Sequence, residues 1–124
     1  MRLPTNDTER KSIRIKQCFL DYFPDAIIDV AKLSWHANEQ HNPGTRPHWD
    51  RNKSGDELDS LLSHLMDAGE LDSDGFLHDT KVAWRAMANL QKRLEDVNYD
   101  QPATDECEEL NAELKEWEDA QLYD

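Results

Sequence analysis

The chain has 124 residues and a formal net charge of −13 at pH 7. This length favours a single domain, and no apolar run is long enough to span a membrane. Residues 95–124 carry 12 acidic side chains and one basic side chain, and this charge disfavours tight binding to duplex nucleic acid. The two cysteines form no close-spaced motif and no apolar leader is present, so a reduced cytoplasmic protein is expected.

The N-terminal part gives a mixed signal before one clear helix. Residues 1–10 are polar and are expected to be irregular, whereas residues 12–22 fit either a strand or a helical face. Pro24 suits the first turn of a helix, which we expect to run from about residue 25 to residue 41 and to end at Asn42-Pro43-Gly44. The residues expected to be buried on it are Ile27, Val30, Ala31 and Ser34.

Two further helices are expected after a loop over residues 45–53. Ser54 and Glu57 have capping-box spacing at the start of the first. Its apolar stripe consists of Leu58, Leu61, Leu62, Leu65 and Met66. An acidic turn over residues 70–76 precedes a helix over about 77–94, with Ala83, Trp84, Met87, Leu90 and Leu94 facing inward. We therefore predict an all-α bundle over residues 1–95, followed by an acidic tail over 96–124 with a weak amphipathic helix.

Acidic side chains at helical spacing suggest a metal site. Asp56 and Asp59 are three residues apart, which places them about 5–6 Å from each other on one helix face. Glu39 lies near the end of the preceding helix, and antiparallel packing would bring it close to them. Oxygen ligands from two helices suit Mg²⁺ or Mn²⁺, with phosphates and water completing the shell. The alternative is that these acids are first-turn residues favoured by the helix dipole.

Histidines and basic residues suggest a phosphate-binding surface. All five histidines fall between residues 36 and 78. Lys81 and Arg85 lie one turn apart on the last predicted helix, where they either bind phosphate oxygens or form a solvated face. Trp49 either stacks on a base or anchors its loop, which also carries Arg46, His48, Arg51 and Lys53.

Two further patterns point to other kinds of site but are incomplete. Glu70, Asp72, Asp74 and Gly75 match the start of an EF-hand loop, but Lys81 stands where the bidentate acid is required. His78-Asp79 is an adjacent pair of the type found in HD phosphohydrolases, which normally need a longer chain with further ligands. A first-turn acid is the simpler interpretation of Asp79.

Several motifs together resemble a known family. They are Tyr22-Phe23-Pro24-Asp25-Ala26, Asn38-Glu39-Gln40-His41-Asn42-Pro43-Gly44, His48-Trp49-Asp50-Arg51, Ser63-His64-Leu65-Met66-Asp67, Gly69-Glu70 with Asp72, Gly75 and His78, and Ala83-Trp84-Arg85. Over residues 20–94 the chain resembles phage dATP/dGTP diphosphohydrolases, which belong with the all-α MazG-like pyrophosphohydrolases. The MazZ type, from phages that replace adenine with 2-aminoadenine, is the nearest in pattern.

The resemblance implies both an activity and a set of site residues. The activity is hydrolysis of dGTP or GTP to the monophosphate and pyrophosphate, which supplies 2-aminoadenine nucleotide synthesis in the host cytoplasm. The family's second acidic pair falls on Asp56 and Asp59, and the last acid of its first pair falls on Glu39. His36 stands where the other acid is usual, which leaves open whether His36 is a ligand or whether Asp29 or another acid takes its place. The family also implies a homodimer or homotetramer and no membrane.

These inferences predict metal-assisted hydrolysis. About two or three Mg²⁺ or Mn²⁺ ions are expected between Glu39, Asp56, Asp59 and the triphosphate. The residues expected to bind substrate are Asn38, Trp49, Lys53, His64, His78, Lys81 and Arg85. The alternatives are a non-enzymatic acidic interaction protein that mimics nucleic acid through its tail, and an HD-type dNTP triphosphohydrolase.

Overall fold

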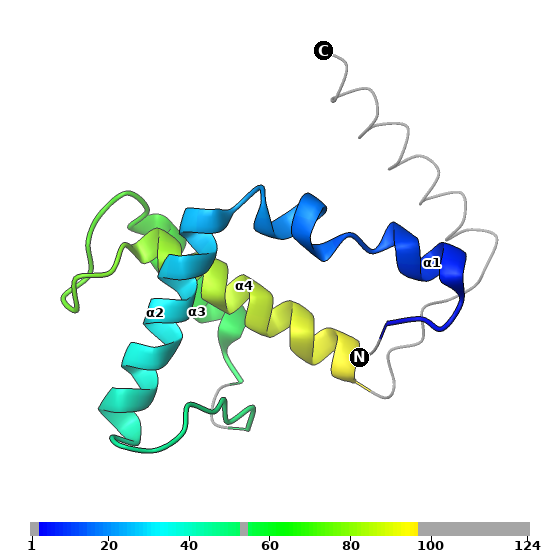
Figure 1. Ribbon diagram of the computed structural model, residues 1–124. Helices are drawn as coiled ribbons and strands as arrows, with labels where there is room; N and C mark the ends of the chain where they lie inside the picture. The colour runs from blue at the N-terminus through cyan, green and yellow to red at the C-terminus, as the bar shows by residue number, and fades with distance from the viewer. Residues whose placement is uncertain (1–2, 53–54, 97–124) are drawn as a thin grey trace, which may run out of the picture.

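The structure, a computed structural model, describes residues 3–52 and 55–96. These residues form α1 (Asp7–Ser12), a π-helical segment η1 (Lys16–Leu20), α2 (Pro24–His41), α3 (Glu57–Met66) and α4 (His78–Glu95) (Figure 1). A single bridge, Leu71 to Leu77, is the only β pairing in this part of the chain. The all-α prediction is therefore confirmed. The predicted tail helix, the Ser54 cap and Lys53 lie outside the described residues.

None of the helices in residues 3–52 and 55–96 combines the length and apolarity needed to cross a bilayer. The three helices predicted over the body are present close to their expected bounds. Pro24 occupies the first turn of α2, where its fixed φ suits a helix and its missing N–H costs no bond. The α2 helix ends where the Asn42 N–H donates to the Asn38 carbonyl at 2.7 Å and Gly44 follows at φ 75°.

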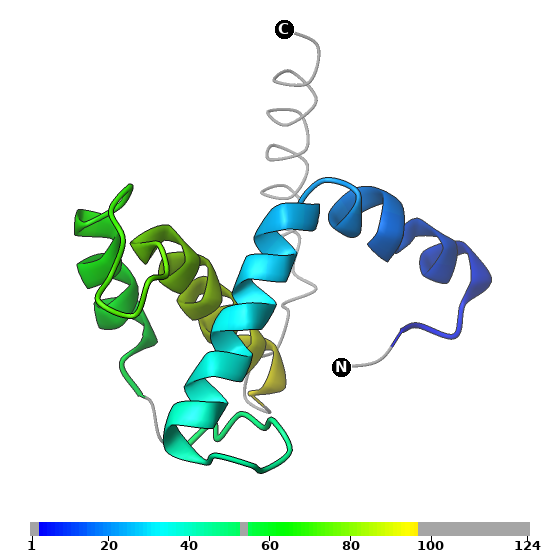
Figure 2. The ribbon, with the colours of Figure 1, turned by 60° about the vertical axis from the view of Figure 1, so that its left-hand side comes forward.

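The N-terminal arm, residues 3–23, differs from expectation. Residues 1–10 were expected to be irregular, but Asn6 caps α1 by accepting hydrogen bonds from the N–H groups of Thr8 and Glu9 at 2.9 and 3.2 Å. Residues 16–20 form a π-helical turn, which agrees with the helical alternative left open for residues 12–22. In Figure 1 the arm runs above α4, and in Figure 2 it extends from the start of α2 to the side away from α3. Its large apolar side chains are exposed: Ile13, Ile15, Phe19, Leu20, Tyr22 and Phe23.

The α4 helix lies at the centre of the body and packs against both α3 and α2 (Figure 2). The expectation that the 25–41 helix packs directly along the next helix is wrong, because α4 supplies the main partner surface for both. The acids of α2 and α3 are consequently not brought together by direct contact of their helices.

The apolar stripe predicted for α3 is mostly exposed in this single chain. Leu58, Leu62 and Leu65 are 51%, 56% and 50% exposed, and on α4 Met87 and Leu90 are also exposed. The α3 face toward α4 instead carries Glu57, Leu61 and His64. Ala88, at 4%, is the one buried hydrophobic residue in the described ranges. The prediction that these α3 and α4 side chains are buried is therefore wrong for a single chain. Packing of α2, α3 and α4 against one another leaves their apolar faces partly uncovered.

The turn between α3 and α4 is tightly hydrogen-bonded. The Asp72 N–H donates to the Phe76 carbonyl at 2.7 Å, and the His78 N–H donates to the Glu70 carbonyl at 3.0 Å. Gly75 has φ 85°, a conformation that favours glycine. The Asp79 carboxylate accepts from the Gly69 N–H at 2.7 Å, so this acid fastens the turn to α4. These bonds fix the acids of the turn relative to both helices.

Candidate functional site

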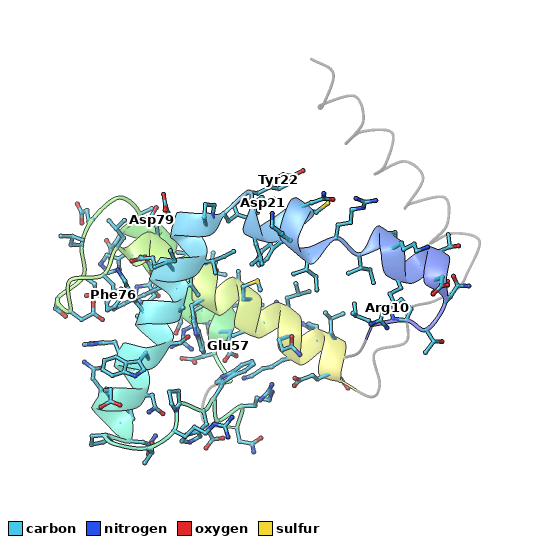
Figure 3. The ribbon with its side chains drawn as sticks, viewed as in Figure 1. Arg10, Asp21, Tyr22, Glu57, Phe76 and Asp79 are labelled. Carbon is cyan, nitrogen blue, oxygen red and sulfur yellow. The ribbon has the colours of Figure 1, made fainter. Side chains whose placement is uncertain are left out.

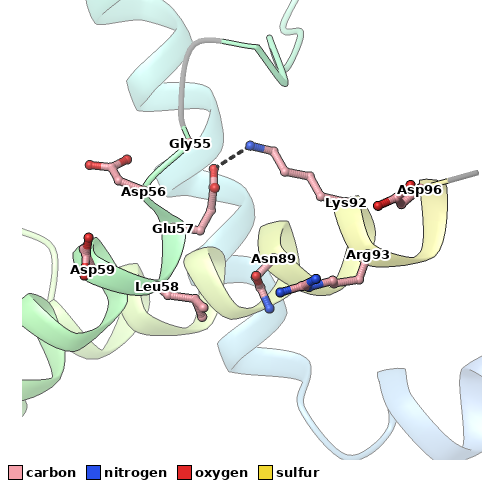
Figure 4. A pocket seen from close by; sticks show the side chains of 9 residues that line it. All are labelled: Gly55, Asp56, Glu57, Leu58, Asp59, Asn89, Lys92, Arg93 and Asp96. Atoms are coloured by element: carbon pink, nitrogen blue, oxygen red, sulfur yellow. Dashed lines mark hydrogen bonds and ion pairs between the residues drawn. The ribbon is translucent and has the colours of Figure 1, made fainter. Parts of the chain in front are cut away.

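A pocket of about 500 Å³ lies between the start of α3 and the last turns of α4 (Figure 4). Asp56 and Asp59 are exposed on its α3 side, and their side chains lie on the same side of the helix start (Figure 4). We call it the carboxylate pocket; it is lined by Gly55, Asp56, Glu57, Leu58, Asp59, Asn89, Lys92, Arg93 and Asp96. It combines acids with basic side chains at an accessible surface.

Glu57 is a buried carboxylate between these acids. It is only 6% exposed, and its Oε1 accepts a hydrogen bond from Lys92 Nζ at 2.9 Å and lies 3.9 Å from Arg85 Nη1. Figure 3 shows it among α2, α3 and α4, unlike Arg10, Asp21 and Tyr22 on the arm. Because a buried charge requires partners, Glu57 both orients two cations and holds α3 on α4.

A second pocket, of about 320 Å³, lies between α2, α3 and α4. We call it the central pocket. Its lining includes His36, Trp49, His64, Asp74, Lys81, Trp84 and Arg85. A further pocket of about 580 Å³, the loop pocket, adjoins it and shares Trp49 and Trp84 as walls. Asn38 and His48 line the loop pocket.

Trp49 and Trp84 form the aromatic wall common to both pockets. Their ring centroids are 5.7 Å apart with the planes at 77°, an edge-to-face pair. Trp84 donates from Nε1 to Ser34 Oγ at 2.6 Å, which fixes its ring on α2. The Arg51 guanidinium lies 4.4 Å from the Trp49 ring centroid. Trp49 therefore anchors the 45–52 loop and also presents an aromatic surface to the pockets.

Three buried polar atoms around these pockets have no hydrogen-bond partner among the described residues: His36 Nε2, Asn38 Oδ1 and Trp49 Nε1. Asn38 is 6% exposed, and its Nδ2 donates to the Thr45 carbonyl oxygen at 3.3 Å. A carbonyl can only accept, so this bond defines which end of the amide is the free acceptor. An unpaired buried polar group costs about 1–3 kcal/mol, so these atoms favour a polar ligand or water in the pockets.

A cluster of ionisable side chains closes one end of the central pocket. His64 Nδ1 lies 2.8 Å from His78 Nδ1. Lys81 Nζ is paired with Asp72 Oδ2 at 2.5 Å and with Asp74 Oδ2 at 2.8 Å. We call these five residues the His-Asp-Lys cluster. It joins the end of α3, the turn and the first turns of α4.

The charges of this cluster follow from its hydrogen bonds. The Lys81 ammonium and the Ser73 N–H lower the pKa of Asp72 to about 2, and Lys81 also lowers the pKa of Asp74. Burial opposes the charge on Lys81, but its two carboxylate partners outweigh burial and raise its pKa. Burial, followed by the Lys81 charge, lowers the pKa of His64. The pair of acids is thus ionised at neutral pH, and His64 is favoured as neutral imidazole.

The structure brings many of the predicted substrate residues together. His36, Trp49, His64, Lys81 and Arg85 line the central pocket, Asn38 lines the adjoining loop pocket, and His78 contacts His64. His36 packs its ring against Phe76 with centroids 5.4 Å apart. These residues come from α2, the loop, α3 and α4, so only the fold assembles them.

The predicted metal ligands are less completely assembled. Asp56 and Asp59 share the carboxylate pocket, whereas Glu39 is half-buried in the last turn of α2. In residues 3–52 and 55–96, the one group of three possible ligands with atoms all within 4.8 Å is His64, Asp72 and His78. Glu39, Asp56 and Asp59 do not form such a group within one chain.

Sequence reasoning missed the importance of Glu57, Asp72 and Trp84 at these pockets. Glu57 was interpreted as a capping-box acid, but it follows the spacing 57, 61, 64 of the buried face of α3. The sequence suggests no ion-pair partner for Asp72, but Lys81, which stands where an EF-hand needs its last acid, is paired with it in the structure. The sequence predicts Trp84 as a core residue. Nothing in the sequence pattern indicates that its indole N–H donates to Ser34 or that its ring lines two pockets.

The geometry thus defines two sets of side chains, one acidic at the start of α3 and one aromatic and basic between the three longest helices. Arg85 links them, because it lines the central pocket and approaches Glu57 of the carboxylate pocket. Comparisons of the chain with protein-family models, with curated proteins and with solved structures gave no match.

Proposed function

We propose that the protein hydrolyses a purine nucleoside triphosphate, most closely dGTP or GTP, to the monophosphate and pyrophosphate with Mg²⁺ or Mn²⁺. The observation that carries the proposal is the central pocket, where Trp49, Trp84 and Arg85 meet beside unpaired polar atoms. An aromatic wall, polar atoms for a base edge and a guanidinium for phosphate are the features that a nucleotide requires.

The base is proposed to lie against Trp49 and Trp84. Asn38 Oδ1 is an acceptor and Trp49 Nε1 is a donor, and both are buried without partners in the described part of the chain. A purine edge offers a neighbouring donor and acceptor that satisfy both kinds of group. Binding the base would therefore remove the energetic cost of leaving these atoms unpaired.

The phosphates are proposed to run from the central pocket toward the start of α3. His64 and Asp59 are five residues apart on α3, a rise of about 7.5 Å, which a triphosphate can span. Arg85 and Lys92 are held along this route by Glu57. Arg85 lines the central pocket and approaches Glu57 of the carboxylate pocket, so we assign the main phosphate contact to it.

Asp56 and Asp59 fit a hydrated Mg²⁺ or Mn²⁺, because such ions commonly use one or two carboxylates and complete their shell with phosphates and water. An ion there would neutralise phosphate charge and lower the pKa of a bound water. In the reaction, a water molecule releases a proton to solvent as its oxygen forms the new bond to the α-phosphorus, and the bond between that phosphorus and the pyrophosphate oxygen breaks. Arg85 and Lys92 then stabilise the charge of the leaving pyrophosphate.

Three further parts of the proposal rest on the family resemblance. The MazG-like fold, a homodimer or homotetramer, and a role in supplying 2-aminoadenine nucleotide synthesis are expected from the sequence motifs. The exposed apolar faces of α3 and α4 support the oligomer, since a second copy would remove them from water.

A nucleotide panel with Mg²⁺ or Mn²⁺ tests the activity, with monophosphate and pyrophosphate measured together. Asp59→Asn should lower turnover at least about 100-fold, because a neutral amide is a poor ligand for a hard cation. Asp67→Asn makes the same change at an exposed acid at the end of α3 and should keep turnover within about twofold.

Two results would overturn the assignment. Release of triphosphate and a nucleoside would indicate an HD-type reaction, and full activity of Asp59→Asn with saturating Mg²⁺ would exclude the carboxylate pocket as the metal site. Circular dichroism of both variants should match the wild type, since Asp59 is exposed.

A further inference from the structure

His64, His78 and Asp72 converge from three separate elements. His64 lies in the last turn of α3, Asp72 in the turn, and His78 at the start of α4. The two Nδ1 atoms are 2.8 Å apart, and Asp72 Oδ2 lies 3.9 Å from His78 Nδ1. Side chains of His78 and Asp72 are only 14% and 24% exposed. The three ligand atoms thus surround one half-buried point.

The donor set matches a particular class of cation. Two imidazole nitrogens and one carboxylate oxygen are typical ligands of borderline-soft divalent ions such as Zn²⁺. Three protein ligands leave the fourth tetrahedral position to a water molecule. Two nitrogens on a tetrahedral Zn²⁺ are roughly 3.3 Å apart, given Zn–N bonds of about 2.0–2.1 Å. The observed separation is therefore short by about half an ångström, which a small ring rotation corrects.

Lys81 is the competing cation at this point. It is paired with Asp72, but it is also 2.8 Å from Asp74, so it can keep one acid partner when Asp72 turns toward a metal. Asp72, Asp74 and Lys81 together carry one negative charge. The cluster consequently retains a net charge that favours a further cation, and its two histidines supply imidazole nitrogens as ligands.

We propose that His64, His78 and Asp72 form a binding site for Zn²⁺ or a similar borderline-soft divalent cation. The site is separate from the Asp56 and Asp59 pair, at the other end of α3. A cation there cross-links the end of α3, the turn and the start of α4, and it fixes the wall of the central pocket that His64 provides. The inference does not depend on the proposed hydrolysis.

Zn²⁺ titration into the EDTA-treated full-length protein, followed by calorimetry, tests the site. We expect about one high-affinity equivalent per chain. His64→Ala and His78→Ala should each weaken it more than about tenfold, because each removes one of three protein ligands. His48→Ala removes an exposed histidine outside the cluster and should leave binding unchanged. Absence of a tight equivalent in the wild type would overturn the proposal.

A second measurement covers the case in which a histidine variant fails to fold. Co²⁺ added to the wild type should give the visible absorption bands of a tetrahedral imidazole complex, and Zn²⁺ should remove them. The double variant Asp56→Asn/Asp59→Asn should retain both the bands and the Zn²⁺ equivalent. Loss of binding in that variant, or Co²⁺ without such bands, would place the ion elsewhere and contradict the proposal.

Discussion

Asn38 shows how a single side chain can be fixed at one end and open at the other. Its amide nitrogen donates to the Thr45 carbonyl, while its oxygen is buried without a partner in the described ranges. A polar group in this position gains more from a ligand than an exposed group does, because its desolvation has already occurred. Within the proposed function, Asn38 therefore contributes to binding the base rather than to the chemical step.

Asn38→Ala is expected to raise KM for the purine triphosphate about tenfold, equal to about 1.4 kcal/mol, with kcat within about twofold. The reason is that the lost acceptor contacts the base equally in the ground state and the transition state. Steady-state kinetics measures both constants.

Thr45→Val is the matched control for the loop contact of Asn38. It removes the hydroxyl, 3.5 Å from Asn38 Nδ2, but keeps the carbonyl that accepts the shorter bond. KM should stay within about twofold of wild type. A fall in kcat for Asn38→Ala at unchanged KM would show that Asn38 acts in the chemical step instead.

At the scale of elements, Glu57 joins the first turn of α3 to the middle and end of α4. Its carboxylate meets Lys92 and Arg85 across the interface of the two helices that pack most closely. Those cations are 26% and 28% exposed, so solvent screens part of the attraction. The contribution is therefore smaller than that of a fully buried ion pair.

Glu57→Gln should lower the free energy of unfolding by about 1–3 kcal/mol, since two cations then lose their negative partner. Urea denaturation followed by circular dichroism measures this change. Glu70→Gln makes the same substitution at an exposed position of the turn and should change stability by less than about 0.5 kcal/mol. Equal effects of the two substitutions would refute a special role of Glu57.

At the scale of the whole molecule, the described residues bury little apolar surface. Leu58, Leu62 and Leu65 form an exposed row on α3, and the N-terminal arm carries further exposed apolar residues. Contiguous apolar surface of this kind is uncommon on a monomer and typical of protein interfaces. A second copy of the chain is the partner that the family resemblance predicts.

The wild-type protein should have a mass in solution of at least twice that of the 14.5 kDa chain, measured by light scattering after gel filtration. Leu62→Glu should shift the protein toward the monomer, because a charge on the α3 row must be desolvated in the interface. Thr8→Glu adds the same charge on the exposed surface of α1 and should leave the mass unchanged. A monomeric wild type at micromolar concentration would contradict the oligomer.

Local sequence signals were sufficient to predict the three main helices. Pro24, the Asn42-Pro43-Gly44 stop and the 3.6-residue periodicity act locally, so α2, α3 and α4 lie close to the predicted bounds. The same local reasoning failed for residues 1–10, where the single Asn6 cap was not recognised.

Which residues share a pocket depends on how the helices pack, and the sequence pattern does not show this. Trp49, His64 and Arg85 are far apart in sequence, and they meet because α4 packs against both other helices. Periodicity identifies an apolar face but not the surface that covers it. The pattern therefore predicts that the apolar stripe of α3 is buried, whereas in the structure Glu57 and His64 face α4 and the stripe is mostly exposed. The apolar periodicity of a helix is the same whether its apolar face packs within its own chain or against another chain. Only the contacts between segments distant in sequence distinguish these two cases.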